Sequence, residues 1–189
     1  MRRRSEMSDI SRLVTAEEFE RYPHEPPYER FELVEGRVIR MSPVSFDHGR
    51  VVARLGFLLS RHLEHHPVGT VGMEVGFKLA SNPDTVRGPD IAFVRRDRVP
   101  TSGRGFFTGA PDLVIEVLSP DDRAGAVRAK TEQYLATGVP VVVIVDPEER
   151  TATTFRPGFP PVALASPNDV PDLSDAITGF RCSLNDILQ

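Results

Sequence analysis

The sequence lacks tryptophan, has a single cysteine and contains no long apolar stretch. The one cysteine, Cys182, excludes an internal disulfide and a cysteine-based metal knuckle, so we expect it to be a small hydrophobic residue of the interior. No segment approaches the roughly 18 apolar residues of a membrane span, and the arginine-rich start precedes nothing that resembles a signal peptide. We therefore expect a cytoplasmic protein.

Lysine is nearly absent as well. Of the 23 basic residues 21 are arginine, and the two lysines are Lys78 and Lys130. In a chain that uses arginine wherever a positive charge suffices, a retained lysine is a candidate for a role that needs a compact ammonium group. The net charge of −4 argues against a protein that coats nucleic acid by bulk electrostatics. Any such contact must concentrate in residues 87–130, which hold eight basic and six acidic side chains.

The 189 residues, 40% of them hydrophobic and 26% charged, have the size and composition of one compact domain. We expect a flexible tail over residues 1–13 and a single domain over residues 14–189. The sequence has no internal repeat, glycine-rich nucleotide loop or serine-hydrolase elbow. ATPase and serine hydrolase functions are therefore without support.

Hydrophobic periodicity predicts a series of helices and strands. A capping box from Thr15 to Glu18 begins the first helix, and the Asn-Pro-Asp turn at 82–84 is expected to join the first two core strands. The predicted elements are a helix at 16–22, a hairpin at 30–41, a helix at 45–65, strands at 70–80, 89–95 and 111–118, a helix at 122–137, a strand at 139–147, outer strands at 151–156 and 162–165, and a helix at 185–188. The core order α-β-β-β-α-β predicts an α/β (α+β) fold. Its mixed β-sheet, flanked by helices, has three antiparallel strands and a fourth reached by a right-handed helical crossover.

Carboxylates inside predicted strands are unusual, because burying a charge is costly unless it is paired or bound to a metal. Glu116 lies in the middle of an apolar strand, and Asp90 begins the strand before it. On neighbouring strands they form a plausible Mg²⁺ or Mn²⁺ site, since Mg²⁺ takes one or two carboxylates together with water and phosphate oxygens. A structural salt bridge is the alternative for Glu116. Asp112 has the strand parity of Glu116, but an aspartate at the start of a strand is more typical of a turn or cap. Glu74 is either a third carboxylate of the site or a polar residue on a solvent-facing side of its strand.

Ordered pieces of the sequence resemble the Uma2 family (DUF820) within the PD-(D/E)XK nuclease superfamily. The matching pieces are TAEEFERYP, RFELVEGRVIRMSPVSFDHGRVVARL, GPDIAFV, GAPDLVIEVLSPDDR, KTEQYLATGVP and VVIVDP, and they span roughly residues 15–188. The resemblance implies a restriction-endonuclease-like core and a divalent ion held by Asp90 and Glu116. It also implies a homodimer, since nucleases of this fold often pair subunits to cut two strands.

The resemblance further implies a catalytic lysine, which the superfamily places two residues after the second acid. Leu118 stands there, and Uma2-like sequences instead carry a lysine on the following helix, matched here by Lys130. A helix residue reaches the same point if its side chain projects over the end of the sheet; a solvated helix lysine is the alternative. His48 matches a histidine frequent in the family, either an auxiliary proton carrier or phosphate contact, or a surface or capping residue.

The leading function hypothesis is a Mg²⁺-dependent endonuclease that hydrolyses DNA phosphodiester bonds. Asp90 and Glu116 hold the ion in this hypothesis, and Lys130 supports the attacking hydroxide. The candidate phosphate contacts are Arg95, Arg96, Arg98, Arg123 and Arg128. The displaced lysine and the negative net charge motivate an alternative: a protein that kept the nuclease fold as a DNA- or protein-binding module after losing efficient catalysis. A metal-dependent hydrolase of another substrate is the third hypothesis.

Overall fold

The computed structural model describes residues 12–22 and 30–189, so most of the predicted tail, residues 1–11, lies outside the described residues. The first helix is α1 (Ala16–Glu20), and its predicted capping box is formed. The Glu18 N–H donates to Thr15 Oγ1, and the Thr15 N–H donates to the Glu18 carboxylate. Among the helices of the described residues, none combines the length and the apolar character that crossing a membrane requires.

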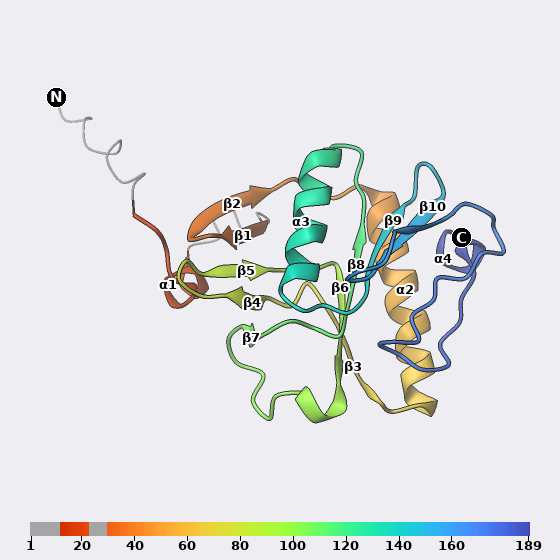
Figure 1. Ribbon diagram of the computed structural model, residues 1–189, viewed down its shortest axis with the longest axis horizontal. Coiled ribbons are helices and arrows are strands. Elements are labelled where there is room, and N and C mark those ends of the chain that lie inside the picture. Colours follow the sequence, from red (N-terminus) through yellow and green to blue (C-terminus); the bar gives the residue numbers. More distant parts are fainter. Residues whose placement is uncertain (1–11, 23–29) are drawn as a thin grey trace.

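A six-stranded sheet forms the centre of the fold (Figure 1). Its strands are β3 (Gly69–Met73), β6 (Ile91–Arg95), β8 (Leu113–Val117), β9 (Val142–Asp146), β10 (Thr151–Phe155) and β11 (Val162–Leu164). β3, β6 and β8 are antiparallel neighbours, and β9 lies parallel to β8 after a crossover through α3 (Ala124–Ala136). The predicted antiparallel strands, helical crossover and mixed sheet are therefore confirmed.

The predicted single strand at 70–80 is wrong, because the chain changes sheets in the middle of it. After β3, Glu74 takes a left-handed backbone conformation with φ +54°, and β4 (Phe77–Ala80) continues in a second sheet. Gly76 is required at this crossing, since a Cβ there would lie 2.4 Å from the Phe106 ring. Both halves are extended, so the sequence reads as one continuous strand.

The second sheet has five strands in the order β2-β1-β5-β4-β7. β1 (Arg30–Val34) and β2 (Arg37–Met41) form the predicted hairpin, and β5 (Thr85–Arg87) lies between β1 and β4. The turn at 82–84 therefore joins β4 to β5 within this sheet, and the prediction that it joins two strands of the central sheet is wrong. β7 (Phe107–Thr108), which was not predicted, pairs in parallel with β4.

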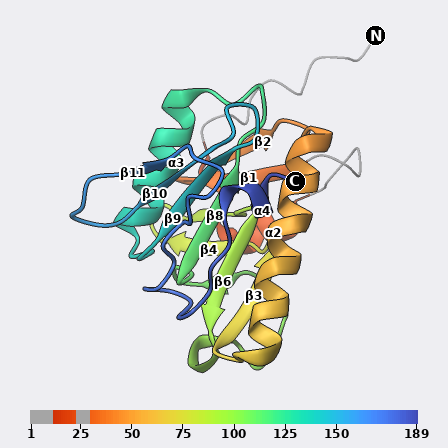
Figure 2. The same cartoon turned by 90° about the vertical axis from the view of Figure 1, so that its right-hand side faces the viewer.

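Helices cover both faces of the six-stranded sheet (Figure 2). α2 (Phe46–His65) packs Leu59 against one face, where α4 (Leu184–Ile187) also lies. α3 covers the other face, and its buried Tyr134 packs in a cluster with Val114. Successive residues of β8 point to opposite faces. Ile115 therefore belongs to the α2 layer, and Glu116 faces the α3 layer.

Candidate active site

Two carboxylates from neighbouring strands face the same layer. Asp90 lies just before β6, and Glu116 lies within β8. The register pairs Ile91 with Ile115, and one residue further along it Asp90 stands opposite Glu116. Opposite side chains in an antiparallel pair have Cβ atoms about 5 Å apart. The Val117 N–H donates to Asp90 Oδ2 at 2.8 Å, which fixes this carboxylate at the end of the strand.

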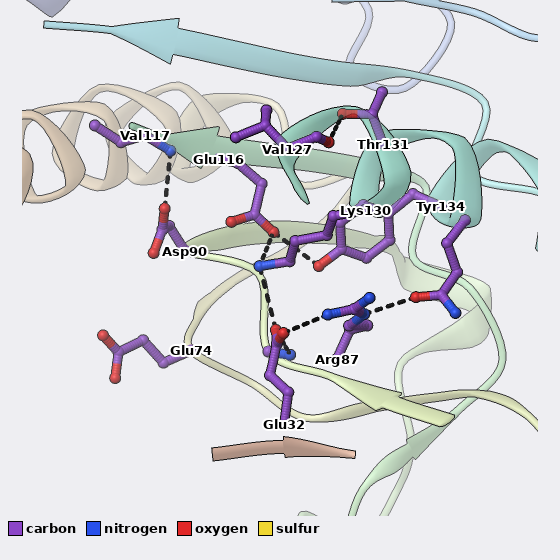
Figure 3. Close-up of polar contacts among 12 residues, drawn as sticks. Glu32, Glu74, Arg87, Asp90, Glu116, Val117, Val127, Lys130, Thr131 and Tyr134 are labelled. Atoms are coloured by element: carbon purple, nitrogen blue, oxygen red, sulfur yellow. Dashed lines mark hydrogen bonds and ion pairs between the residues drawn. The ribbon is translucent and has the colours of Figure 1, made fainter. Parts of the chain in front are cut away.

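Lys130 reaches this pair from α3 (Figure 3). Its Nζ lies 2.8 Å from Glu116 Oε1 and 3.2 Å from Glu32 Oε1. The Tyr134 hydroxyl, one helical turn further along, donates to the same Glu116 oxygen at 2.8 Å. The Lys130 side chain is 16% exposed, so it is not the solvated lysine of the alternative interpretation. The structure therefore brings Asp90, Glu116 and Lys130 together at one end of the sheet.

Glu32 is the residue of this cluster that the sequence analysis missed. It lies in β1, is 3% exposed, and accepts hydrogen bonds from Arg87 at 2.6 Å and from the Gly88 N–H at 3.1 Å. Arg87 in turn donates to Gln133 of α3 at 2.7 Å. The alternation of the hairpin places Glu32 on the polar face of β1, but that face contacts α3 through Lys130. A carboxylate inside a strand, the signal that singled out Glu116, was available here too.

His48, in the first turn of α2, contacts Asp90 from the other helical layer. Its Nε2 lies 3.3 Å from Asp90 Oδ1, and its Nδ1 lies 3.3 Å from the Ser119 hydroxyl oxygen. The imidazole is buried. The His48 backbone N–H donates to Ser45 Oγ, which caps the helix. His48 therefore belongs to the helix cap through its backbone and to the carboxylate cluster through its side chain.

Arg30 links Asp90 to the rim of the site. One of its nitrogens lies 3.5 Å from Asp90 Oδ1 and 3.5 Å from Glu74 Oε1. The Glu74 side chain is 57% exposed, and Figure 3 shows it apart from Glu116 and Lys130. Over residues 12–22 and 30–189, no group of three or more histidine, cysteine or acidic side chains is arranged to hold a metal ion. The site therefore offers a cation the two carboxylates of Asp90 and Glu116.

Burial and neighbouring charges shift the pKa values of this cluster. Burial raises the pKa of Glu116 to about 7; the Asp90 and Glu32 carboxylates add to the rise, and Lys130 opposes it. Burial also acts against the charged form of Asp90, but hydrogen bonds, first that from His48, outweigh it and lower the pKa of Asp90. Burial would lower the pKa of Lys130, but Glu116 and Glu32 outweigh it and raise that pKa. A carboxyl group that titrates near neutrality beside a pocket is typical of a functional site.

The raised pKa of Glu116 predicts a stability that depends on pH. Between the ordinary glutamate pKa of 4.5 and about 7, the folded protein binds this proton and the unfolded chain does not, so stability falls as the pH rises through this window. We therefore compare the free energy of unfolding of Glu116→Gln with that of the parental protein at two pH values. The difference, variant minus parental protein, should be about 1–3 kcal/mol more positive at about pH 8 than at about pH 5. Urea unfolding without divalent ions measures it, with the exposed Glu132→Gln as control. An equal effect at both pH values would contradict the prediction.

Asp90, Glu116 and Lys130 line a pocket of about 310 Å³, whereas Glu32 and Tyr134 are not among its lining residues. The ionisable residues that line the pocket are Arg30, His48, Arg87, Asp90, Glu116, Asp122 and Lys130. Much of the remaining lining is apolar and comes from β2, from the segments that flank the helices, and from α3; it includes Ile39, Met41, Val44, Leu118 and Val127. The pocket therefore combines a charged side with an apolar side.

Three of the predicted phosphate contacts, Arg95, Arg96 and Arg98, do not lie at this pocket. Arg95 is the last residue of β6, and the length of this strand places it roughly 16 Å from Asp90 at about 3.3 Å per residue. Arg96 and Arg98 follow it in a short 3-10 helix. Arg95 and Arg98 lie 3.7 and 2.8 Å from the buried Asp112 carboxylate, which also accepts a hydrogen bond from the Arg95 N–H. These contacts give Asp112 a structural role as the partner of Arg95 and Arg98. Arg30 and Arg87 line the pocket instead, and the sequence analysis did not single them out.

The remaining residues that the sequence analysis singled out are Arg123, Arg128, Lys78 and Cys182. Arg123 is the N-cap of α3 and Arg128 is exposed on its surface, so phosphate contact by both stays a prediction. Lys78 lies in β4 of the second sheet, 3.0 Å from Asp84. Cys182 is buried, as predicted.

A known protein family and a solved structure each match most of this chain. The family model Uma2, described as "Putative restriction endonuclease", matches residues 16–185, which include the whole carboxylate and lysine cluster. A crystal structure described as a "putative nuclease belonging to DUF820 from Anabaena variabilis ATCC 29413" is similar, with a TM-score of 0.79 and 23% sequence identity over 93% of this chain and 97% of that one. The fold is therefore shared with that protein. No curated protein matches this chain.

Proposed function

This chain belongs to the Uma2 family, and we propose that it is a Mg²⁺-dependent endonuclease that hydrolyses phosphodiester bonds of DNA. The observation that carries the proposal is Lys130 Nζ at 2.8 Å from Glu116 Oε1, with Asp90 at the opposite strand position. Two carboxylates and an ammonium group thus line one pocket. The description of the family supports a nuclease function.

Asp90 and Glu116 fit a divalent cation by the chemistry of their donor atoms. Mg²⁺ prefers one or two carboxylates and fills its other positions with water and phosphate oxygens, and the same two side chains would hold Mn²⁺. The contacts of Lys130 and Tyr134 both fall on Glu116 Oε1, and Figure 3 shows the other carboxylate oxygen on the side of Asp90. A cation bound there lowers the pKa of water and neutralises charge on a phosphate.

The residues around the carboxylates have distinct tasks in the proposed reaction. Lys130 stays protonated because Glu116 and Glu32 raise its pKa, so its positive charge stabilises negative charge that develops on the phosphate. His48 holds the Asp90 carboxylate by a hydrogen bond and helps to keep it ionised. Arg30, also in the pocket lining, adds positive charge for the DNA backbone.

Removal of the metal is the direct test of the proposed function. We expect the purified protein to cut DNA with Mg²⁺ or Mn²⁺ and to lose this cleavage in EDTA, measured on gels with single-stranded, duplex and branched DNA. Calorimetry with Mn²⁺ should show binding that Asp90→Asn weakens by about tenfold or more. A protein that cuts none of these DNAs with either ion would contradict the proposal.

The alternative of an inactive binding module was based on two observations, the displaced lysine and the negative net charge, and one of them still favours it. The displaced lysine no longer favours it, because Lys130 reaches Glu116 from α3. The net charge of −4 still does. Binding of DNA or of a protein partner without Mg²⁺ binding at Asp90 and Glu116 would favour the module. A homodimer and a cytoplasmic location remain predictions.

A further inference from the structure

The apolar side of the pocket has no task in the chemistry proposed above. Ile39 and Met41 come from β2, Val44 precedes α2, and Val127 comes from α3. None of these side chains can hold a cation or donate a hydrogen bond to a phosphate. A ligand that fills this pocket must therefore present an apolar surface beside its charged group.

The charged groups lie deep enough to restrict what can reach them. The side chains of Asp90, Glu116 and Lys130 are 6%, 12% and 16% exposed. A phosphodiester must enter the pocket to contact them. The outer surface of a paired duplex presents phosphates and sugars, while its bases are stacked inside. An unpaired nucleotide brings its phosphate together with a free base, whose flat apolar faces can pack against the apolar side of the pocket.

An exposed aromatic residue lies close in the sequence to two residues that line the pocket. Phe46 is the first residue of α2, is 86% exposed, and lies two residues from Val44 and two from His48, which both line the pocket. Ile39 and Val44 are themselves 42% and 43% exposed. Exposed aromatic and apolar side chains next to positive charges are the arrangement on which single-stranded nucleic acids stack their bases. Here Arg30 and Lys130 supply the positive charge.

We propose that the pocket binds an unpaired nucleotide of single-stranded DNA, with its base against Ile39, Val44 and Phe46 and its phosphate toward Arg30 and Lys130. The inference rests on the proposed function, because it names the form of DNA that the nuclease takes. Duplex DNA is then a substrate only where a base is unpaired, as at a mismatch, a bulge or a frayed end.

Binding without cleavage tests the inference. The probes are a fluorescein-labelled oligothymidylate strand and the same strand paired with oligoadenylate, followed by fluorescence anisotropy in EDTA. We expect the single strand to bind about tenfold more tightly than the duplex, and Phe46→Ala to weaken single-strand binding by about tenfold, because base stacking on the ring is lost. Phe46→Tyr should retain the binding.

Phe159→Ala is the matched control. Phe159 is 71% exposed and lies in the turn after β10, at the Val142 end of the sheet and away from the pocket. Equal affinity for the two DNAs, or a Phe46→Ala protein that binds like the control, would overturn the inference whether or not DNA is cut. Selective single-strand binding that depends on Phe46, in a protein that cuts no DNA, would instead support this inference and contradict the proposed nuclease activity.

Discussion

Replacing Glu116 with glutamine is expected to lower the rate of Mg²⁺-dependent DNA cleavage by about a hundredfold or more. A catalytic metal ion contributes several kcal/mol to transition-state stabilisation, and each 1.4 kcal/mol is about tenfold in rate. Glutamine keeps the shape of the side chain and can still accept the hydrogen bond from Tyr134, so the fold is retained. Its neutral amide gives the cation no charge. Asp90→Asn should have the same consequence, measured by initial cleavage rates.

The control for these variants lies on α3. Glu132 is exposed and pairs with Arg128 at 2.8 Å, so Glu132→Gln should cut DNA at the parental rate. If Asp90 and Glu116 hold one ion, the double variant should be no slower than the slower single variant, because the ion is lost only once. A Glu116→Gln protein with the parental cleavage rate would show that the reaction does not depend on this carboxylate.

Lys130→Arg is expected to reduce the cleavage rate by about a hundredfold, although the positive charge is kept. The ammonium group lies between Glu32 and Glu116 and 5.9 Å from the centre of the Tyr134 ring. A guanidinium group is larger and planar, so it cannot occupy the same place between the two carboxylates. Lys130→Met should remove the activity and also destabilise the protein by about 3–5 kcal/mol, since buried carboxylates lose their shared cation.

The chain offers a matched control in its other lysine. Lys78 is also paired, at 3.0 Å from Asp84, but it lies in β4 of the second sheet. Lys78→Arg should therefore leave the cleavage rate unchanged. Cleavage rates and urea unfolding of the three variants separate a catalytic effect from a loss of folded protein. Equal rates for Lys130→Arg and Lys78→Arg would show that the position needs only a positive charge.

The predicted part of the site depended on patterns that are local in the sequence. Asp90 and Glu116 stood out because a carboxylate within an apolar strand is costly, and the order of the strands placed them side by side. Lys130 was singled out by the arginine bias and by family resemblance. The pattern of its helix does not show which residue reaches the sheet, so its contact with Glu116 required the structure.

The parts that were missed depend on long-range packing. Glu32 lies 98 residues before Lys130, and their contact exists because the second sheet lies against α3. The division of residues 70–80 between two sheets follows from the left-handed backbone at Glu74, which an alternating pattern does not reveal. Charge counting identified residues 87–130 as the basic part of the chain and as the place for phosphate contacts. Arg95 and Arg98 of this part nevertheless lie at the far end of a strand, where they neutralise Asp112.

The position of Lys130 between Glu32 and Glu116 has a consequence for when the centre can exist. β1 is synthesised first, β8 much later, and α3 only after both. A nascent chain therefore holds no complete centre until residue 130 has left the ribosome and the β1–β2 hairpin has docked. Opening of that hairpin alone would withdraw one of the two carboxylates from Lys130 while the six-stranded sheet stays folded. In the proposed nuclease, catalytic competence would therefore require β1, β8 and α3 to be folded against one another.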